Sequence, residues 1–206
     1  MNFEQPKPDS KKYSDLISEI QKGIIKIPKF QRDFVWSIDK TAKLLDSILK
    51  GYPIGTFILW QTDERINDIK NVGNLEIPPT PDGTKVQYVL DGQQRITSLY
   101  AAYLGAKLQK VGEKKITDYN DIVVNLDTDI NENDGQVISA EPTGEKYLSL
   151  NEVLNFSFSK AKALSDKFSE EELELIDSYS TAFKTYEFST VVLRKEDIDS
   201  AIDVFT

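Results

Sequence analysis

Hydrophobic residues recur every three to four positions in several stretches of the chain, the spacing that places them on one face of an α-helix. Each stretch follows a serine or aspartate that can cap a helix, and three of them end at a glycine. The pattern predicts helices over residues 14–23, 37–51, 92–105 and 169–179, with a further helix starting at Glu196.

Shorter apolar runs bounded by turn residues predict β-strands. The predicted strands cover residues 54–60, 86–90, 121–126, 146–150 and 188–193. Residues 24–36 are expected to be extended around Pro28, and residues 61–85 to form a long surface excursion. Because helices and strands are mixed without an internal repeat or a shift in composition, we expect a single α+β domain over residues 1–206.

The composition excludes several kinds of chemistry. The chain has no cysteine and no histidine, so it offers no thiolate, disulfide, zinc finger, Ser-His-Asp triad or histidine-metal nuclease centre. Any reaction must use carboxylates, amides, hydroxyls, lysine or arginine. No apolar run approaches the ~20 residues that span a bilayer, and the N-terminus is polar. We therefore expect a soluble cytoplasmic protein with no membrane contact.

Charge is unevenly distributed along the chain. The net charge is −9, which argues against a protein that coats DNA through bulk electrostatics. Residues 1–60 nevertheless carry a net charge of +3, and the remainder −12. A mildly basic N-terminal third could face a polyanion, although ordinary solvated faces would explain the same distribution.

The five residues Asp91-Gly92-Gln93-Gln94-Arg95 lie where a predicted strand turns into a predicted helix. The free N–H groups and positive dipole end of such a helix can hold an anion. Alternatively, Asp91 and Gln94 have the spacing of a capping box, which needs no ligand. Arg95 opposes the helix dipole by ~0.3–1 kcal/mol unless a carboxylate or a phosphate compensates it.

A second segment, Ile27-Pro28-Lys29-Phe30-Gln31-Arg32-Asp33-Phe34-Val35-Trp36, interleaves an arginine with aromatic residues. In an extended chain, alternation would place one arginine and three aromatics on one side, namely Phe30, Arg32, Phe34 and Trp36. Such an arginine needs a carboxylate, a π face or a phosphate. The alternative is a core-facing aromatic ladder in which Arg32 pairs with Asp33 or Asp91.

Together the segments IPKFQRDFVW, GYPIG and YVLDGQQRITSL resemble the N-terminal domain of the GmrSD-like, modification-dependent restriction systems. The resemblance covers about residues 10–105. It implies a ParB/sulfiredoxin-like mixed sheet with surrounding helices, here with helical and strand elaborations toward the C-terminus. It also implies a regulatory domain that binds and hydrolyses a nucleoside triphosphate with Mg²⁺ in a defence system against modified foreign DNA.

The same resemblance implies roles for individual residues. The motif tied to hydrolysis supplies the candidate catalytic residues Asp91, Gln93, Gln94 and Arg95, with Asp91 also as the Mg²⁺ ligand. The residues implied to bind the nucleotide are Gly92, Pro28, Gln31, Arg32 and Trp36. The implied partners are nucleotide, modified DNA and an HNH-type nuclease domain or subunit that does the cutting.

Two other functions are compatible with these residues, and the sequence differs from the family pattern at two places. The chain could be a non-catalytic module that senses DNA modification and recruits or controls a nuclease, or a scaffold that only holds the nuclease. Relatives commonly carry tyrosine where this chain has Phe30. Relatives also continue into an Arg-Ile-Asn-Thr-Gly-Gly stretch where this sequence ends at Thr206, so we expect a domain truncated at its C-terminal end.

Overall fold

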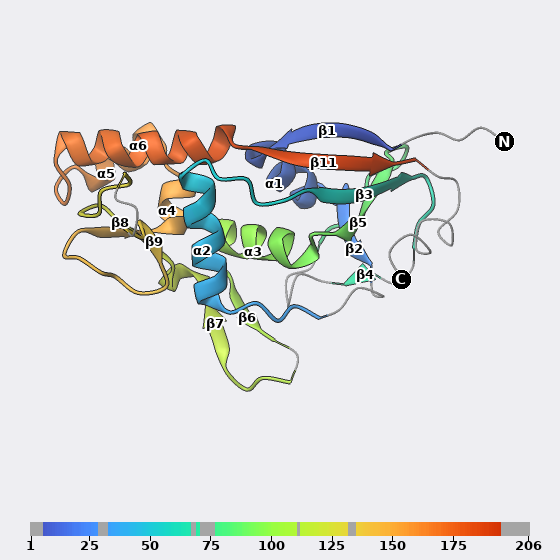
Figure 1. Ribbon diagram of the computed structural model, residues 1–206, viewed down its shortest axis with the longest axis horizontal. Coiled ribbons are helices and arrows are strands. Elements are labelled where there is room, and N and C mark those ends of the chain that lie inside the picture. The colour runs from blue at the N-terminus through green and yellow to red at the C-terminus, as the bar shows by residue number, and fades with distance from the viewer. Residues whose placement is uncertain are drawn as a thin grey trace.

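A mixed six-stranded sheet occupies one end of the protein (Figure 1). The structure is a computed structural model that describes residues 6–28, 33–66, 69–70, 77–110, 112–131 and 135–194. The strand order is β1-β11-β3-β5-β2-β4. The strands are β1 (Lys7–Lys12), β2 (Ile25–Pro28), β3 (Phe57–Thr62), β4 (Ile69–Lys70), β5 (Val86–Asp91) and β11 (Glu187–Leu193). The β11–β3 and β2–β5 pairs are parallel, and the other pairs are antiparallel.

Alternating side chains give the sheet two apolar faces. Phe57, Leu59 and Val89 belong to the large core shared with the helices, whereas Trp60 and Tyr88 belong to a smaller cluster on the other face. The Trp60 and Tyr88 rings pack 5.6 Å apart. Strands that are buried on both sides explain why the predicted runs were almost continuously apolar.

Helices cover the first of these faces. They are α1 (Tyr13–Gln21), α2 (Ile38–Leu49), α3 (Gln93–Leu104) and α6 (Glu170–Thr185). Ser37 caps α2 by accepting a hydrogen bond from the Lys40 N–H at 3.2 Å. At the start of α6, Ser169 and Glu172 form the reciprocal capping box that the sequence indicates. Figure 1 shows α3 running from the sheet toward the far end of the molecule, with α2 crossing it.

Smaller elements fill the end of the protein away from the sheet. A three-stranded sheet of order β10-β8-β9 comprises β8 (Val123–Asn125), β9 (Ile138–Ser139) and β10 (Tyr147–Ser149), followed by α4 (Leu150–Leu154) and α5 (Phe158–Leu164). The strands β6 (Lys107–Gln109) and β7 (Ile116–Asp118) form a hairpin that leads into the 3₁₀ turn η1 (Tyr119–Asp121). Asp46 of α2 accepts a hydrogen bond from the Ile138 N–H at 2.9 Å, which ties the smaller sheet to the helices.

The α+β class is confirmed, and each predicted helix and strand within the described residues is present, with boundaries shifted by a few residues. The largest difference at a strand start is β3, which begins at Phe57 instead of residue 54. Helices α4 and α5 were not predicted, and neither were the short strands β4, β6, β7 and β9 or the edge strand β1. The helix expected from Glu196 lies outside the described residues. Where the structure describes the chain, no helix is long and apolar enough to cross a membrane.

Candidate functional site

The turn between β5 and α3 requires glycine at position 92. Gly92 has φ +93°, in the left-handed region that favours glycine, and it is the N-cap of α3. A Cβ atom at this position would also collide with the Phe57 ring. The strand therefore passes directly into the helix with the backbone packed against Phe57.

The Arg95 guanidinium contacts two backbone carbonyls, one carboxylate and one aromatic ring around this turn. Its Nη1 donates to the Ile54 carbonyl at 2.7 Å, and its Nη2 donates to the Thr56 carbonyl at 2.9 Å and to Asp91 Oδ2 at 3.1 Å. The guanidinium also lies over the Phe57 ring, 4.9 Å from the ring centroid. Only 16% of the Arg95 side chain is exposed. The compensating anion that a first-turn arginine requires is thus present in the chain as the Asp91 carboxylate.

The capping box that was the alternative explanation for Asp91 and Gln94 does not form. The helix begins at Gln93, because the N-cap is Gly92, and no side chain caps it. Asp91 is instead the last residue of β5, and its side chain is 59% exposed. The left-handed glycine moves the start of the helix one residue beyond the position that the spacing indicated.

Gln94 connects the two predicted motif segments. Its Oε1 accepts a hydrogen bond from the Val35 N–H at 2.9 Å, and its Nε2 donates to the Asp33 carbonyl at 2.8 Å. Gln94 is buried, with 5% exposure. Its amide therefore fixes the backbone of residues 33–35 against the start of α3. Gln93 is also buried beside it, with 6% exposure.

The remaining predicted site residues come from the first segment. Pro28 ends β2, which is parallel to β5, so the two segments leave the same edge of the sheet. Trp36 is half-buried, and the Lys40 ammonium lies 4.3 Å from the centroid of its ring. Gln31 and Arg32 lie outside the described residues. The structure therefore ties the start of α3 to residues 33–35 through Gln94. Pro28 lies at the end of the strand beside β5, and Trp36 follows the residues that Gln94 binds.

The segment IPKFQRDFVW was predicted to alternate between two sides, and residues 33–36, its described part after Pro28, do so. Phe34 packs against the core and Trp36 is half-buried, whereas Val35 is 61% exposed. Residues 33–37 nevertheless form no strand, because their backbone is bound by a glutamine side chain rather than by a neighbouring strand.

Two neighbours of Arg95 were not recognised from the sequence. Gly55 has φ +88°, and a Cβ atom there would lie 2.6 Å from Arg95 Nη1. Phe57 forms the apolar floor beneath the guanidinium. Gly55, the second glycine of the GYPIG segment, was the available signal for this contact, since a glycine next to a strand often marks a close approach of another group.

Asp91 could share a magnesium ion with a phosphate. Mg²⁺ is usually held by one or two carboxylates together with substrate phosphates and water. The exposed Asp91 carboxylate meets this requirement, since only its Oδ2 binds Arg95 among the described residues. Across the described ranges, no group of three or more His, Cys, Asp or Glu residues could hold a metal ion. Asp91 as a magnesium ligand therefore stays a prediction.

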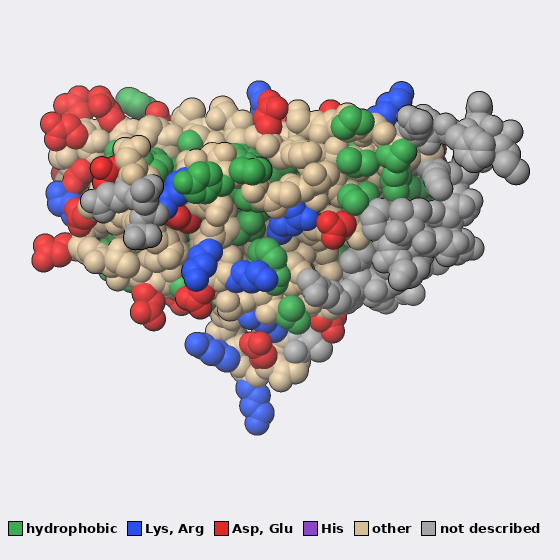
Figure 2. Space-filling view, in the orientation of Figure 1, with side chains coloured by type: hydrophobic (Ala, Val, Ile, Leu, Met, Phe, Trp, Pro, Cys, Tyr) green, Lys and Arg blue, Asp and Glu red, His purple; other side chains and the backbone are tan. Residues whose placement is uncertain are grey.

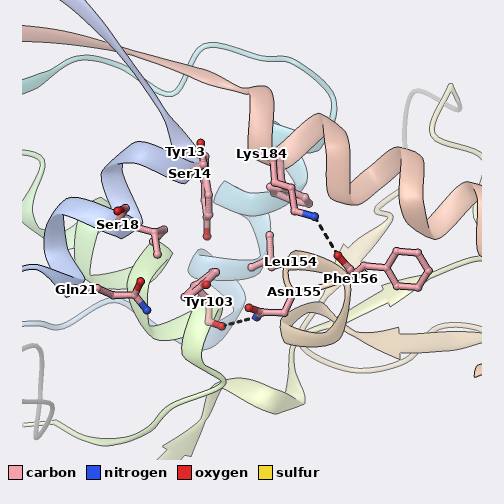
Figure 3. Close-up of a pocket in the computed structure, with 11 residues that line it drawn as sticks. Tyr13, Ser14, Ser18, Gln21, Tyr103, Leu154, Asn155, Phe156 and Lys184 are labelled. Atoms are coloured by element: carbon pink, nitrogen blue, oxygen red, sulfur yellow. Dashed lines mark hydrogen bonds between the residues drawn. The ribbon is translucent and has the colours of Figure 1, made fainter. Parts of the chain in front are cut away.

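A cavity of about 390 Å³ lies at the other end of α3 (Figure 3). Tyr103 of α3 lines it together with residues of α1, α4 and α6. Two hydrogen bonds brace its wall, from Asn155 Nδ2 to the Tyr103 carbonyl at 3.1 Å and from Lys184 Nζ to the Phe156 carbonyl at 3.1 Å. Burial, and secondarily the nearby Tyr103, raises the pKa of Tyr13 at its floor. None of the predicted site residues that the structure describes lines this cavity.

Comparison with known proteins identifies relatives of the chain. The model of the family described as "GmrSD restriction endonuclease, N-terminal domain" matches residues 13–206. An uncharacterized protein of Methanocaldococcus jannaschii is 32% identical over 160 residues. The matched region is 75% of this chain and 27% of that protein, so the chain spans about a quarter of the length of this curated relative.

Proposed function

Because the chain belongs to the family of GmrSD restriction endonuclease N-terminal domains, we propose that it binds and hydrolyses a nucleoside triphosphate at the edge of its sheet. Family membership supports a regulatory role in a restriction system that acts on modified DNA. In this proposal a separate nuclease domain or subunit of the HNH type cuts the DNA. The proposed nucleotide site lies at the carboxyl ends of β2 and β5.

The observation that carries the proposal is the joining of the two motif segments. Strands β2 and β5 are adjacent and parallel, and each motif segment follows the carboxyl end of one strand. Gln94 then holds residues 33–35 against the start of α3. Ligands of open sheets commonly bind in the crevice outside the carboxyl ends of parallel strands.

The start of α3 is suited to a phosphate group. The helix has a glycine N-cap, no side-chain cap and no acidic residue in its first turn. Its first N–H groups and its positive dipole end can therefore bind phosphate oxygens. Arg95 is paired with Asp91, so Arg32, which precedes the residues bound by Gln94 in the sequence, would supply the additional positive charge.

Catalysis would depend on positioning and electrostatics, as is usual for phosphoryl transfer. Asp91 would hold a bound Mg²⁺, which neutralises charge on the phosphates. Arg95 keeps the Asp91 carboxylate oriented, because it is itself fixed by two backbone carbonyls. Gln94 binds the backbone of residues 33–35 with its amide, so in this proposal Gln93 would orient the attacking water.

The test is phosphate release by the 206-residue chain with each nucleoside triphosphate, in the presence and absence of Mg²⁺. We expect Mg²⁺-dependent turnover that Asp91→Ala abolishes. Asp82→Ala is the matched control, because Asp82 is exposed and lies outside both motif segments. Absence of turnover and of nucleotide binding in the wild-type chain, or equal turnover in both variants, would contradict the proposal. DNA binding without turnover would favour the non-catalytic sensing module.

A further inference from the structure

The hairpin of β6 and β7 projects from the body of the protein (Figure 1). Its base is well anchored, because Leu108 and Tyr119 are fully buried. The Tyr119 N–H donates to the Ala106 carbonyl at 2.9 Å, and Asn120 Nδ2 donates to the Gly105 carbonyl at 2.9 Å. The described part of the hairpin is therefore an arm anchored at its base, with Leu108 turned inward and residues 112–116 exposed.

The end of this arm carries unbalanced positive charge. Both acidic residues of the hairpin have lysine partners, in the pairs Lys107–Asp118 at 3.0 Å and Lys110–Glu113 at 3.9 Å. Lys114 and Lys115 are exposed and form no ion pair with any described residue. Ile116, next to them, is 56% exposed. An apolar side chain beside two unpaired cations is a combination that a nucleic acid can accommodate.

The first turns of α2 extend this positive region. Thr41 of α2 donates to Ser98 of α3 at 3.0 Å and lies beside the buried Tyr119 at the base of the arm. Burial raises the pKa of Tyr119 to about 12, an effect that the nearby Thr41 hydroxyl partly opposes. Near Thr41 in the sequence, Lys40 and Lys43 are exposed together with one acidic residue, Asp39, so these turns carry two cations against one carboxylate. The arm and the start of α2 are therefore neighbouring parts of one surface.

Figure 2 shows how charge is distributed over this face. Lysine and arginine side chains extend from the middle of the face to the projecting arm with single acidic side chains among them, whereas acidic side chains gather at the end that holds the start of α6. The whole chain has a net charge of −9, so the basic region is local. A polyanion would be attracted to this region and repelled by the acidic end.

We propose that this face binds double-stranded DNA, with the β6–β7 arm entering the major groove and Lys114 and Lys115 contacting the phosphates beside it. The major groove is about 12 Å wide and admits a two-stranded β-ribbon. Ile116 would then approach the base edges, and Lys40 and Lys43 would contact the backbone nearby. Duplex RNA does not offer the same site, because its major groove is deep and narrow. The proposal rests on the proposed function only in its choice of DNA as the polyanion.

The test is binding of a DNA duplex by the 206-residue chain over a range of salt concentrations. We expect Lys114→Glu with Lys115→Glu to weaken binding about tenfold or more and to reduce the dependence of log Kd on log salt by about 0.9 for each lost phosphate contact. The control is Lys162→Glu with Lys167→Glu, which changes the same charge at exposed positions outside the arm and α2. We expect the control to retain most of the affinity.

The outcomes are decisive in either direction. Equal losses in both double variants would mean that only total charge matters, and wild-type affinity in the arm variant would remove the arm from the interface. A chain that binds no DNA, or binds duplex RNA more tightly, would also overturn the proposal. Nucleotide turnover measured without DNA should be unchanged in the arm variant. Failure of the DNA surface is therefore distinguishable from failure of the proposed nucleotide site.

Discussion

The side-chain amide of Gln94 donates to the backbone carbonyl of Asp33 at 2.8 Å, across a separation of 61 residues. The oxygen of the same amide accepts a hydrogen bond from the backbone N–H of Val35, two residues further along the chain. A buried glutamine thus takes the place that a neighbouring strand would have in a sheet. This contact makes one site of two segments that are remote in the sequence.

Replacement of Gln94 by alanine should reduce both stability and nucleotide binding. The change removes two partly buried hydrogen bonds, each of which contributes about 0.5–1.5 kcal/mol, so the free energy of unfolding should fall by about 1–3 kcal/mol. Urea unfolding measures this loss, and calorimetry measures nucleotide affinity. Gln109→Ala is the control, since that amide is exposed. If Gln94→Ala binds nucleotide as the wild type does, the contact has no role in the proposed site.

Replacement of Arg95 by alanine should be strongly destabilising. The guanidinium serves two backbone carbonyls and one carboxylate and packs on Phe57, so its loss should cost roughly 2 kcal/mol or more. Thermal unfolding measures the effect. Arg95→Lys keeps the charge but not the planar set of donors, and we expect it to restore only part of the stability. A loss below 0.5 kcal/mol, roughly that of an ordinary surface substitution, would show that these contacts are unimportant.

Asp91 should matter far more for turnover than for folding. Its ion pair with Arg95 involves a carboxylate that is 59% exposed, and such pairs contribute about 0–1 kcal/mol. Asp91→Asn should therefore keep the fold while it removes the charge that Mg²⁺ requires. Phosphate release and urea unfolding of the same preparation separate the two effects. Retention of turnover in this variant would eliminate Asp91 as the metal ligand.

Arg32 and Arg95 should be coupled through one bound nucleotide, Arg32 directly and Arg95 through the Asp91 carboxylate that it orients. Residues that share a ligand show interaction energies of about 0.5–3 kcal/mol in a double-mutant cycle, whereas independent sites add to within roughly 0.5 kcal/mol. We expect Arg32→Ala and Arg95→Lys to be clearly non-additive in nucleotide titrations with Mg²⁺. Strict additivity would mean that they serve different ligands, with Arg32 as a DNA contact.

Lys26 should make stability depend on pH in the alkaline range. Burial, together with the nearby Arg65, lowers the pKa of this lysine from its ordinary value of 10.5. The folded protein therefore releases the proton at a lower pH than the unfolded chain does. The destabilisation is full below the folded pKa and is relieved as the pH rises through that value toward 10.5.

Lys26→Met should accordingly raise the free energy of unfolding at neutral pH by about 0.5–2 kcal/mol. The difference from the wild type should shrink near pH 10, and urea unfolding at both pH values measures it. The exposed Lys22 provides the control variant, Lys22→Met, in which no such change is expected. A difference that stays constant with pH would exclude desolvation of the Lys26 ammonium as its cause.

Elements with strong periodic patterns were predictable from the sequence. The α6 capping box was recognised because Ser169 and Glu172 satisfy each other locally, without help from the rest of the fold. The same spacing misled at Asp91 and Gln94, because their polar groups are used by Arg95 and by the backbone of residues 33–35. Spacing alone cannot distinguish a local partner from a remote one.

The candidate site shows the same limit. Its two motif segments were recognisable in the sequence and were expected to lie close together. The hydrogen bond from Gln94 to the Asp33 carbonyl agrees with that expectation. The contacts of Arg95 with Ile54 and Thr56 were not predictable, because they are made to carbonyl groups, which every residue carries. This also explains the late start of β3, since the extended residues before Phe57 bind Arg95 instead of a strand.

The position of β11 has a consequence for synthesis of the protein. Among the described residues, strand β1 has β11 as its only neighbour in the sheet, and β11 also pairs with β3. At about 5–20 residues per second, the ribosome delivers β11 roughly ten seconds or more after β1. An unpaired strand is prone to aggregate during such a delay, and lysine and proline oppose this. Strand β1 has the polar sequence Lys-Pro-Asp-Ser-Lys-Lys, which lacks the apolar alternation of a typical strand. This polar sequence therefore suits a strand that must stay soluble until its partner emerges.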